Sequence, residues 1–465
     1  MRIMASSSPQ GGLVQQREVQ ATPAWIQLGA DFDGKAAYDH FGQAVTMSSD
    51  GTVLAAGAPN GDTGYVRVFK YASSKWTQLG TDIFGAAAAS DYFGSSVSLS
   101  SDGTVLAVGA FLHDGIGNSS GRVRVYNYIN SKWTQRGADI NGKAAGDYFG
   151  GSVDLSSDGT VLAVGASGND GNGSDSGHVQ VYKYANNIWT QMGTDINGEA
   201  AGDESGTSVS LSSNGNVLAV GAWRNEGNGE RSGHVRVYTF ANSQWSQLGA
   251  DIDGEAVGDL SGQSVSLSSN GTVLAVGAVD NSGSTPGSYS GHVRVYQFAN
   301  NAWTQLGADI DGEAFGDSFG SSVSLSSDGI VLAVGAYLND WTSQYSDRGH
   351  VRVYKYANSK WTQMGVDIDA EGDYDYFGTS VSLSSDGTLL AVGAPLNDGN
   401  AARSSGHVRV YKFLTPAPST AKPTNKPTNK PTTKSPTNKP IKPTTKSPTN
   451  KPTSKKPTNK PTKAK

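Results

Sequence analysis

Two segments of the chain carry oxygen-bearing side chains at every second residue, a spacing that suits a metal ion. The oxygens belong to Asp170, Asn172 and Ser174 in the first segment, and to Glu226, Asn228 and Glu230 in the second. Carboxylate, amide and hydroxyl oxygens are the hard ligands that Ca²⁺ prefers. A polar Gly-Asn turn without any bound ion explains the same residues equally well. Ca²⁺ is therefore a cofactor that the sequence leaves open, and the sequence indicates no other.

Large aromatic side chains form the second group of candidate functional residues, because they lie in otherwise polar loops. A flat, exposed ring suits stacking on a sugar face or anchoring a protein partner. Loops that fold back over their own aromatic rings are the alternative. The predicted ligand-binding residues are Phe111, Trp223, Tyr289, Tyr337, Trp341 and Tyr345.

Other residues that could do chemistry recur too regularly to form one active site. An Asp stands two residues before a glycine seven times, at Asp39, Asp91, Asp147, Asp203, Asp259, Asp317 and Asp375. Five histidines, His178, His234, His292, His350 and His407, precede a repeated Val-x-Val-Tyr. Equivalent positions on a symmetric scaffold do not converge on one substrate, so we interpret both sets as structural. No acid and base pair breaks the repeat, and the sequence predicts no catalytic residue and no enzyme.

These residues are carried by an internal repeat of 51 to 58 residues. Seven copies are anchored by Phe41-Gly42 and its equivalents, and a second anchor, Trp-x-Gln-x-Gly, recurs with them. Each copy reads as four short strands, such as "SVSLSS", "TVLAVGA", "HVRVYKY" and "KWTQLGADI", with Asp-Gly or Asn-Gly at the tight turns. Seven such units predict an all-β, seven-bladed β-propeller of four-stranded blades. The unpaired first strand around Trp25 should complete the last blade and close the ring.

The motif pairs Phe41-Gly42 with Gly57-Ala58-Pro59, and Phe377-Gly378 with Gly393-Ala394-Pro395, resemble FG-GAP repeats. These form the blades of integrin α-subunit propellers and of many extracellular proteins, and the chain resembles the subgroup without integrin context. The resemblance implies the propeller fold. It does not carry over the integrin-type calcium sites, because "SLSSDGTV" stands where those blades have D-x-D-x-D-G.

The predicted strand order places short turns on one face of the ring and every long loop on the other. The long loops include those that begin at Phe111, Ser167, Trp223, Val279 and Tyr337. Binding residues are found disproportionately on loops that a rigid scaffold positions. The long-loop face is therefore the predicted binding face.

Composition separates a propeller body from a basic tail. Residues 421–465 hold 13 of the 36 basic residues and no acidic residue, so the preceding 420 residues carry 23 basic against 41 acidic residues. A proline every three to five residues predicts an extended, disordered tail. The expected domains are a flexible leader at 1–22, the propeller at 23–415 and the Lys/Pro/Thr-rich tail at 416–465. The tail lacks aromatic residues, so we expect an anionic matrix or cell-wall polymer as its partner and no specific nucleic acid.

The sequence thus predicts a non-catalytic, monomeric adhesion propeller that binds a glycan or a protein on its long-loop face. The resemblance and the tail composition imply an extracellular or cell-wall location, although residues 1–20 lack the apolar core of a secretory signal. No apolar run of 18 residues predicts a membrane-spanning helix. Two alternatives remain open: an intracellular WD-like interaction scaffold, and a propeller hydrolase or lyase.

Overall fold

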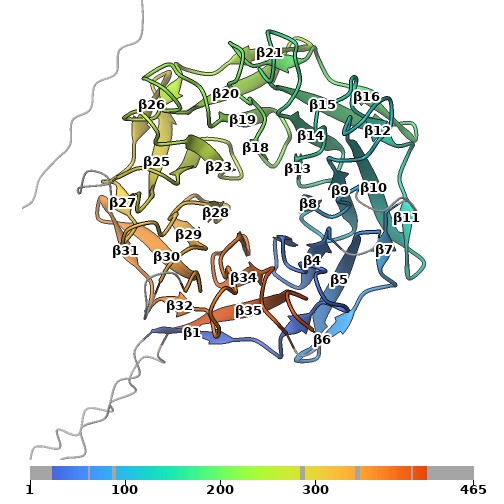
Figure 1. Cartoon of the computed structure of the whole chain (residues 1–465), viewed down its shortest axis with the longest axis vertical. Helices are drawn as coiled ribbons and strands as arrows, with labels where there is room; N and C mark the ends of the chain where they lie inside the picture. The colour runs from blue at the N-terminus through green and yellow to red at the C-terminus, as the bar shows by residue number, and fades with distance from the viewer. Residues whose placement is uncertain are drawn as a thin grey trace, which may run out of the picture. The chain divides into compact units, whose positions relative to one another are not determined.

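A computed structural model describes residues 23–60, 63–85, 91–282, 289–340, 346–399 and 402–415. The described chain is all β-structure, and its strands form seven sheets that follow one another around a ring (Figure 1). The prediction of an all-β, seven-bladed propeller is confirmed. Within these residues there is no helix long and apolar enough to cross a membrane. Backbone contacts divide the chain into Met1–Pro416 and Ala417–Lys465, and the predicted leader and tail lie outside the described residues.

Each blade begins with a short strand at the centre of the ring and continues with a buried second strand. The innermost strands are β3 (Ala44–Met47), β8 (Val97–Leu99), β13 (Ser152–Leu155), β18 (Ser208–Leu211), β23 (Ser261–Leu267), β28 (Ser322–Leu325) and β33 (Ser380–Leu383). The second strands are β4 (Val53–Ala58), β9 (Val105–Ala110), β14 (Val161–Ala166), β19 (Val217–Ala222), β24 (Val273–Ala278), β29 (Val331–Ala336) and β34 (Leu389–Ala394). The second strands read as continuous apolar runs because both of their faces are covered by neighbouring blades.

The outer half of each blade pairs one long strand with two short ones. The third strands are β5 (Tyr65–Ala72), β10 (Arg122–Ile129), β15 (His178–Ala185), β20 (His234–Ala241), β25 (His292–Ala299), β30 (His350–Ala357) and β35 (His407–Leu414). The fourth strands are β6 (Lys75–Gln78), β11 (Lys132–Gln135), β16 (Ile188–Gln191), β21 (Gln244–Gln247), β26 (Ala302–Gln305), β31 (Lys360–Gln363) and β1 (Ala24–Gln27). After a break, the chain pairs again with the third strand through β7 (Ile83–Phe84), β12 (Ile140–Asn141), β17 (Ile196–Asn197), β22 (Ile252–Asp253), β27 (Ile310–Asp311), β32 (Ile368–Asp369) and β2 (Phe32–Asp33).

Glycine at two repeated positions lets consecutive blades approach each other closely. A Cβ atom on Gly109, in the second strand of one blade, would lie 2.1 Å from the carbonyl oxygen of Gly150 in the next blade. The same contact recurs around the ring, for example between Gly57 and Gly94. Any larger residue would separate the blades, since real atoms do not approach so closely. This contact explains why the Phe-Gly and Gly-Ala motifs repeat together.

The repeated tryptophan joins each blade to the one before it. Trp133 Nε1 donates a hydrogen bond to the Leu79 carbonyl at 2.9 Å, and its ring packs on Gly80. The other six repeats make the same bond at 2.8 to 3.0 Å. An indole buries a large apolar surface while its N–H finds a partner. The repeated Trp therefore packs between consecutive blades.

The first strand of the chain closes the ring. Strand β1 pairs antiparallel with β35, so that Trp25 lies opposite Phe413 and Ala24 opposite Leu414. In Figure 1 the blue β1 runs beside the orange β35. Trp25 Nε1 bonds the Met364 carbonyl of the preceding blade at 2.8 Å, as in every other repeat. The predicted closure around Trp25 is confirmed.

The innermost strands surround a narrow cavity of about 290 Å³ on the axis of the ring. At its wall, seven backbone N–H···O=C hydrogen bonds of 2.8 to 2.9 Å form a closed circuit through Ser49, Ser101, Ser157, Ser213, Ser269, Ser327 and Ser385. Side chains join neighbouring blades as well, since Ser98 Oγ accepts the Leu155 N–H at 3.0 Å. Hydrogen bonding around the axis therefore fixes the position of each blade relative to the next.

Candidate ligand-binding site on the long-loop face

The residue immediately before each Phe-Gly or Ser-Gly dipeptide has a left-handed backbone. The seven residues, with φ between 52° and 56°, are His40, Tyr92, Tyr148, Glu204, Leu260, Ser318 and Tyr376. A side chain that bears a Cβ in this region costs about 1 kcal/mol or more, and such strain is concentrated at functional sites. The conformation is the same in all blades, whereas the side chain is imidazole, phenol, carboxylate, alkyl or hydroxyl. The backbone conformation at this position is thus the same in every repeat, while the chemical type of the side chain varies.

Four of these seven residues line one pocket of about 450 Å³. The connections that enter four successive blades supply His40, Tyr92, Tyr148 and Glu204, and the loops after the second strands add further side chains. The other side chains that line the pocket include Gln43, Pro59, Asn60, Ser95, Phe111, Thr207 and Trp223. Since both sets of loops leave the blades on the same face, the pocket opens on the long-loop face.

The apolar wall of this pocket is a row of aromatic rings. The centroids of Tyr92 and Phe111 lie 5.5 Å apart, and those of Phe111 and Tyr148 lie 6.1 Å apart, both in edge-to-face geometry. Edge-to-face contacts hold rings in place and leave part of their faces free. The fourth ring, Trp223, lies in the loop after strand β19 of the fourth blade. This loop is equivalent to the one that carries Phe111 after β9.

Polar groups hold Trp223 and line the rest of the pocket. Trp223 Nε1 donates to Glu204 Oε2 at 2.8 Å, while Arg224 Nη1 pairs with Glu204 Oε1 at 2.6 Å. The Arg224 guanidinium also lies over the Trp223 ring, 4.6 Å from its centroid. On the other side, Asn60 Nδ2 lies 2.8 Å from His40 Nδ1, and burial lowers the pKa of His40. The imidazole is therefore neutral near pH 7 and able to share a hydrogen bond with a neutral ligand.

The structure brings together two of the six aromatic residues predicted from the sequence. Phe111 and Trp223 line the pocket, but Tyr337 packs edge-on against Tyr376, with centroids 5.6 Å apart. Tyr289 is half-exposed and contacts Phe315 at 6.1 Å. Trp341 and Tyr345 lie outside the described residues.

Sequence reasoning missed His40, Tyr92, Tyr148 and Glu204. It treated the positions before Phe-Gly as part of the repeated anchor. Their signal was variation inside an otherwise constant motif, from His to Tyr to Glu to Leu.

The two predicted calcium loops use several of their polar groups in hydrogen bonds within the protein. The Asn172 amide donates to the Gly198 carbonyl at 2.7 Å, and Asp170 Oδ1 accepts the Asp175 N–H at 2.9 Å. In the second loop, the Asn228 amide donates to the Gly254 carbonyl at 2.8 Å. Calcium binding by Asp170, Asn172, Ser174, Glu226, Asn228 and Glu230 stays a prediction.

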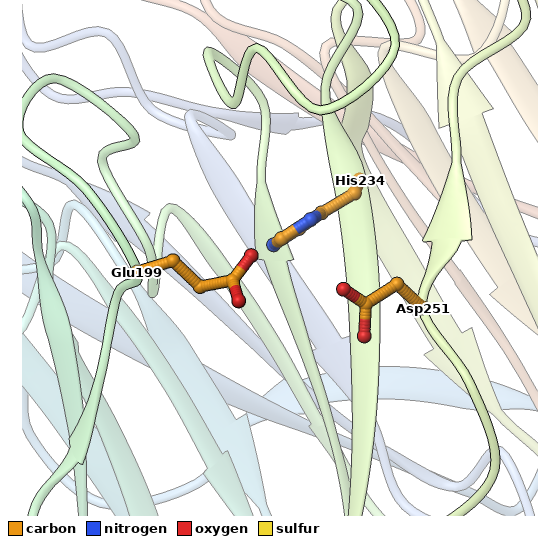
Figure 2. A group of neighbouring side chains, drawn as sticks. All are labelled: Glu199, His234 and Asp251. Atoms are coloured by element: carbon orange, nitrogen blue, oxygen red, sulfur yellow. The ribbon is translucent and has the colours of Figure 1, made fainter.

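Clusters of one histidine and two carboxylates recur in three blades. In the first, Figure 2 shows Glu199 and Asp251 on either side of His234, and their ligand atoms lie within 4.8 Å of one another. The guanidinium of Arg236 pairs with both Glu199 and Asp251. The other two clusters, Glu255–His292–Asp309 and Glu313–His350–Asp367, contain Arg294 and Arg352 in the same role. An arginine thus supplies the positive charge, and we interpret the clusters as ion pairs that join the blades.

The repeated Asp residues accept hydrogen bonds from the connections between blades. Asp147 Oδ2 accepts the N–H groups of Lys143 and Ala144 at 2.9 and 2.8 Å, and its Oδ1 accepts the Asn169 amide at 3.0 Å. Asp39 and Asp259 bond the N–H groups of their own connections in the same way. The predicted role as structural acceptors is therefore confirmed for these residues.

One carboxylate departs from the repeat at the axis of the ring. Asp154 stands where the other innermost strands carry Ser or Thr, and it lines the axial cavity. Its carboxylate accepts hydrogen bonds from the Ser98 hydroxyl at 2.9 Å and from the Leu155 and Leu211 N–H groups at 2.9 and 2.7 Å. Burial raises the pKa of Asp154 to about 6, against these hydrogen bonds.

Comparison with protein families identifies the repeat. Residues 83–126, 141–182, 197–240 and 367–411 match the family model described as FG-GAP repeat. The protein is therefore a seven-bladed β-propeller of FG-GAP repeats, consistent with the integrin-α-like propellers. A comparison with curated proteins gives no match.

Solved structures of diverse proteins show the same fold. The RRP9 WD40 repeats are 15% identical with a TM-score of 0.52, over 85% of this chain and 99% of that chain. Hydrazine synthase from Kuenenia stuttgartiensis is 14% identical with a TM-score of 0.50, over 82% and 96%. A putative 6-phosphogluconolactonase from Bacteroides uniformis is 13% identical with a TM-score of 0.50, over 71% and 86%. At these identities the likeness concerns the fold alone.

Proposed function

We propose that this protein is a non-catalytic binding propeller that holds a carbohydrate in the pocket of the long-loop face. The observation that carries the proposal is the pocket itself, where four aromatic rings meet at positions that vary among otherwise constant repeats. A ring of near-identical blades becomes selective only where the blades differ. The pocket is the place where those differences are gathered.

The chemistry of the wall supports a sugar rather than a charged ligand. Its volume of about 450 Å³ suits one or two sugar rings, within the usual range of ligand pockets. The aromatic faces of Tyr92, Tyr148 and Trp223 suit the C–H face of a pyranose. Asn60 and Thr207 offer hydrogen bonds to hydroxyl groups. A protein ligand that inserts an apolar side chain is the other candidate for the same wall.

Binding is better supported than catalysis by the residues that line the pocket. Among those that the structure describes, Glu204 is the one carboxylate, and it is paired with Arg224 and Trp223. Hydrolysis of a glycosidic bond generally uses two carboxyl groups on opposite sides of that bond. The enzyme alternative would need a second acid outside these residues.

The tail gives the proposal a cellular context. The evenly spaced lysines of residues 421–465 suit an anionic polymer, such as a sulphated or carboxylated polysaccharide. An extracellular or cell-wall location with adhesion through both parts of the chain follows as part of the proposal. Expression of the native gene product with localisation by antibody tests it, and a cytosolic location would favour the WD-like scaffold.

Binding of the full-length chain to an array of neutral and anionic glycans tests the pocket. We expect Trp223→Ala and Phe111→Ala each to weaken binding of a neutral glycan by about tenfold or more, since each removes a ring face. Tyr289→Ala is the matched control, because this exposed ring lies outside the pocket. Loss of binding in the control alone, or no neutral glycan bound at all, would remove the carbohydrate proposal.

A further inference from the structure

A second cavity, of about 360 Å³, lies where the first strands of the chain join the last blade. Asp31 and Asp33 reach it from the β1–β2 segment, while the connection into the seventh blade supplies Glu371, Asp373 and Asp375. Asp398 and Asn397 come from the loop between β34 and β35, and His407 begins β35. We call this the closure cavity. It is lined by two segments of chain that are more than 300 residues apart in sequence.

The closure cavity is strongly acidic. Six of its lining residues are carboxylates, and among the described residues that line it none is a lysine or arginine. Arg409 pairs with Asp31 and Glu371 from beside the cavity, and Arg348 pairs with Asp373 at 2.5 Å. Two guanidiniums therefore face six carboxylates.

His407 adds a buried imidazole to the closure cavity. The side chain is 2% exposed and lines the closure cavity, and its Nε2 atom has no hydrogen-bond partner, as is also true of His178 and His350 in other blades. A buried polar atom without a partner destabilises the fold unless something else satisfies it. A neutral imidazole is a common metal ligand.

Asp373 distinguishes the closure cavity from the same region of other blades, where the equivalents of Glu371, His407 and Asp31 recur. At the position of Asp373, five other blades have Ala37, Ala145, Ala201, Val257 and Phe315. The positions of Glu371 and Asp33 vary less, because three blades keep an acidic residue at each, whereas the third blade has Lys143 and Asn197. One carboxylate, that of Asp373, is therefore added where the ring closes, at a position that these five blades fill with an apolar side chain.

From this geometry we propose that the closure cavity binds a divalent cation. Its donor set, several carboxylate oxygens with one imidazole nitrogen, suits a cation of the Ca²⁺ or Mn²⁺ type. Asp375 and His407 are buried and form the base of the site, whereas Glu371, Asp373 and Asp398 are exposed and form its rim. An ion held there bridges the first strands of the chain to the last blade. The proposal is independent of carbohydrate binding.

Titration of the chelator-treated full-length chain with Mn²⁺ and with Ca²⁺ tests the site. Calorimetry then measures the unfolding temperature with and without the metal. We expect one saturable site and a rise in the unfolding temperature at saturating metal, because a ligand that binds only the folded state stabilises it. Asp373→Ala and Asp33→Asn should each weaken binding by about tenfold or more. Both introduce residues that equivalent positions of other blades already carry, so the fold tolerates them.

Two controls locate the ion. Asp253→Asn, the position in the fourth blade that corresponds to Asp33, should leave the affinity unchanged. Glu226→Gln, in one of the long loops predicted to hold calcium, should also leave it unchanged. Saturable binding that survives Asp373→Ala and Asp33→Asn but is lost in Glu226→Gln would overturn the proposal, as would no saturable binding at millimolar metal.

Discussion

Asp154 shows how one residue departs from a repeat at a cost in stability. Its hydrogen bonds from Ser98, Leu155 and Leu211 favour the ionised carboxylate, yet burial prevails and raises the pKa to about 6. The folded protein therefore binds the proton more tightly than the unfolded chain between about pH 4 and pH 6. Stability contributed by this group falls as the pH rises through that window, and the penalty is fully present above it.

Asp154→Ser should consequently stabilise the protein at pH 8. The serine hydroxyl would accept the Leu211 N–H as serines do in other blades, for example Ser210 for Leu267 at 3.0 Å. We expect a gain of about 1–2 kcal/mol at pH 8, somewhat less than the full pKa shift implies, because the side chain partly faces the axial cavity. Denaturant unfolding at pH 8 and at pH 4 measures it. A gain of equal size at both pH values would exclude titration of Asp154 as the cause.

The candidate site could be predicted only in part at the residue scale. Phe111 and Trp223 were predicted because an aromatic ring in a polar loop has no core to fill. Tyr148 and Glu204 were not predicted, because their importance depends on a left-handed backbone that turns the position before Phe-Gly or Ser-Gly toward the pocket. His407 was interpreted as structural, and its unpartnered nitrogen becomes visible only beside carboxylates from the other end of the chain.

At the scale of elements, the tryptophan strands hold the blades together. Six of these strands are covalently continuous with the blade that they complete, whereas β1 belongs to the seventh blade only through its pairing with β35. At the closure, the same side-chain interaction therefore holds a strand that is not covalently continuous with its blade. The indole of Trp25 helps to hold the ring shut.

Trp25→Ala should destabilise the propeller and loosen its first strand. Removal of a half-buried indole and its hydrogen bond to Met364 costs about 2–4 kcal/mol. Limited proteolysis followed by mass spectrometry should show early cleavage near β1. Trp133→Ala, which removes the same interaction between two internal blades, should lower stability similarly without exposing β1. Equal protection of β1 in both variants would show that Trp25 does not hold the closure.

Elements were the most predictable level of this structure. Alternating "HVRVYKY" and the apolar "TVLAVGA" fixed the two central strands of each blade, since their patterns match strands with one and two covered faces. The break that separates β6 from β7 was not foreseen. It follows from Gly80, whose positive φ and missing side chain make room for Trp133 of the next blade.

At the scale of the whole molecule, seven near-equal blades made the ring predictable, but not its asymmetries. Counting copies of one motif gives the number of blades and the strand that closes them. The pocket and the closure cavity depend instead on residues from several blades, or from both ends of the chain. Such groups have no signature in any single repeat, so they appear only when the ring is assembled.

The pairing of Ala24 with Leu414 has a mechanical consequence. Both ends of the ring-forming chain leave the propeller at one cross-strand pair, and β1 and β35 run antiparallel from there. Tension between the two ends of the chain therefore peels the pairs apart one at a time, beginning with Ala24 and Leu414 and passing to Trp25 and Phe413. A ring that is stabilised by many equal contacts thus opens at low force along a single line.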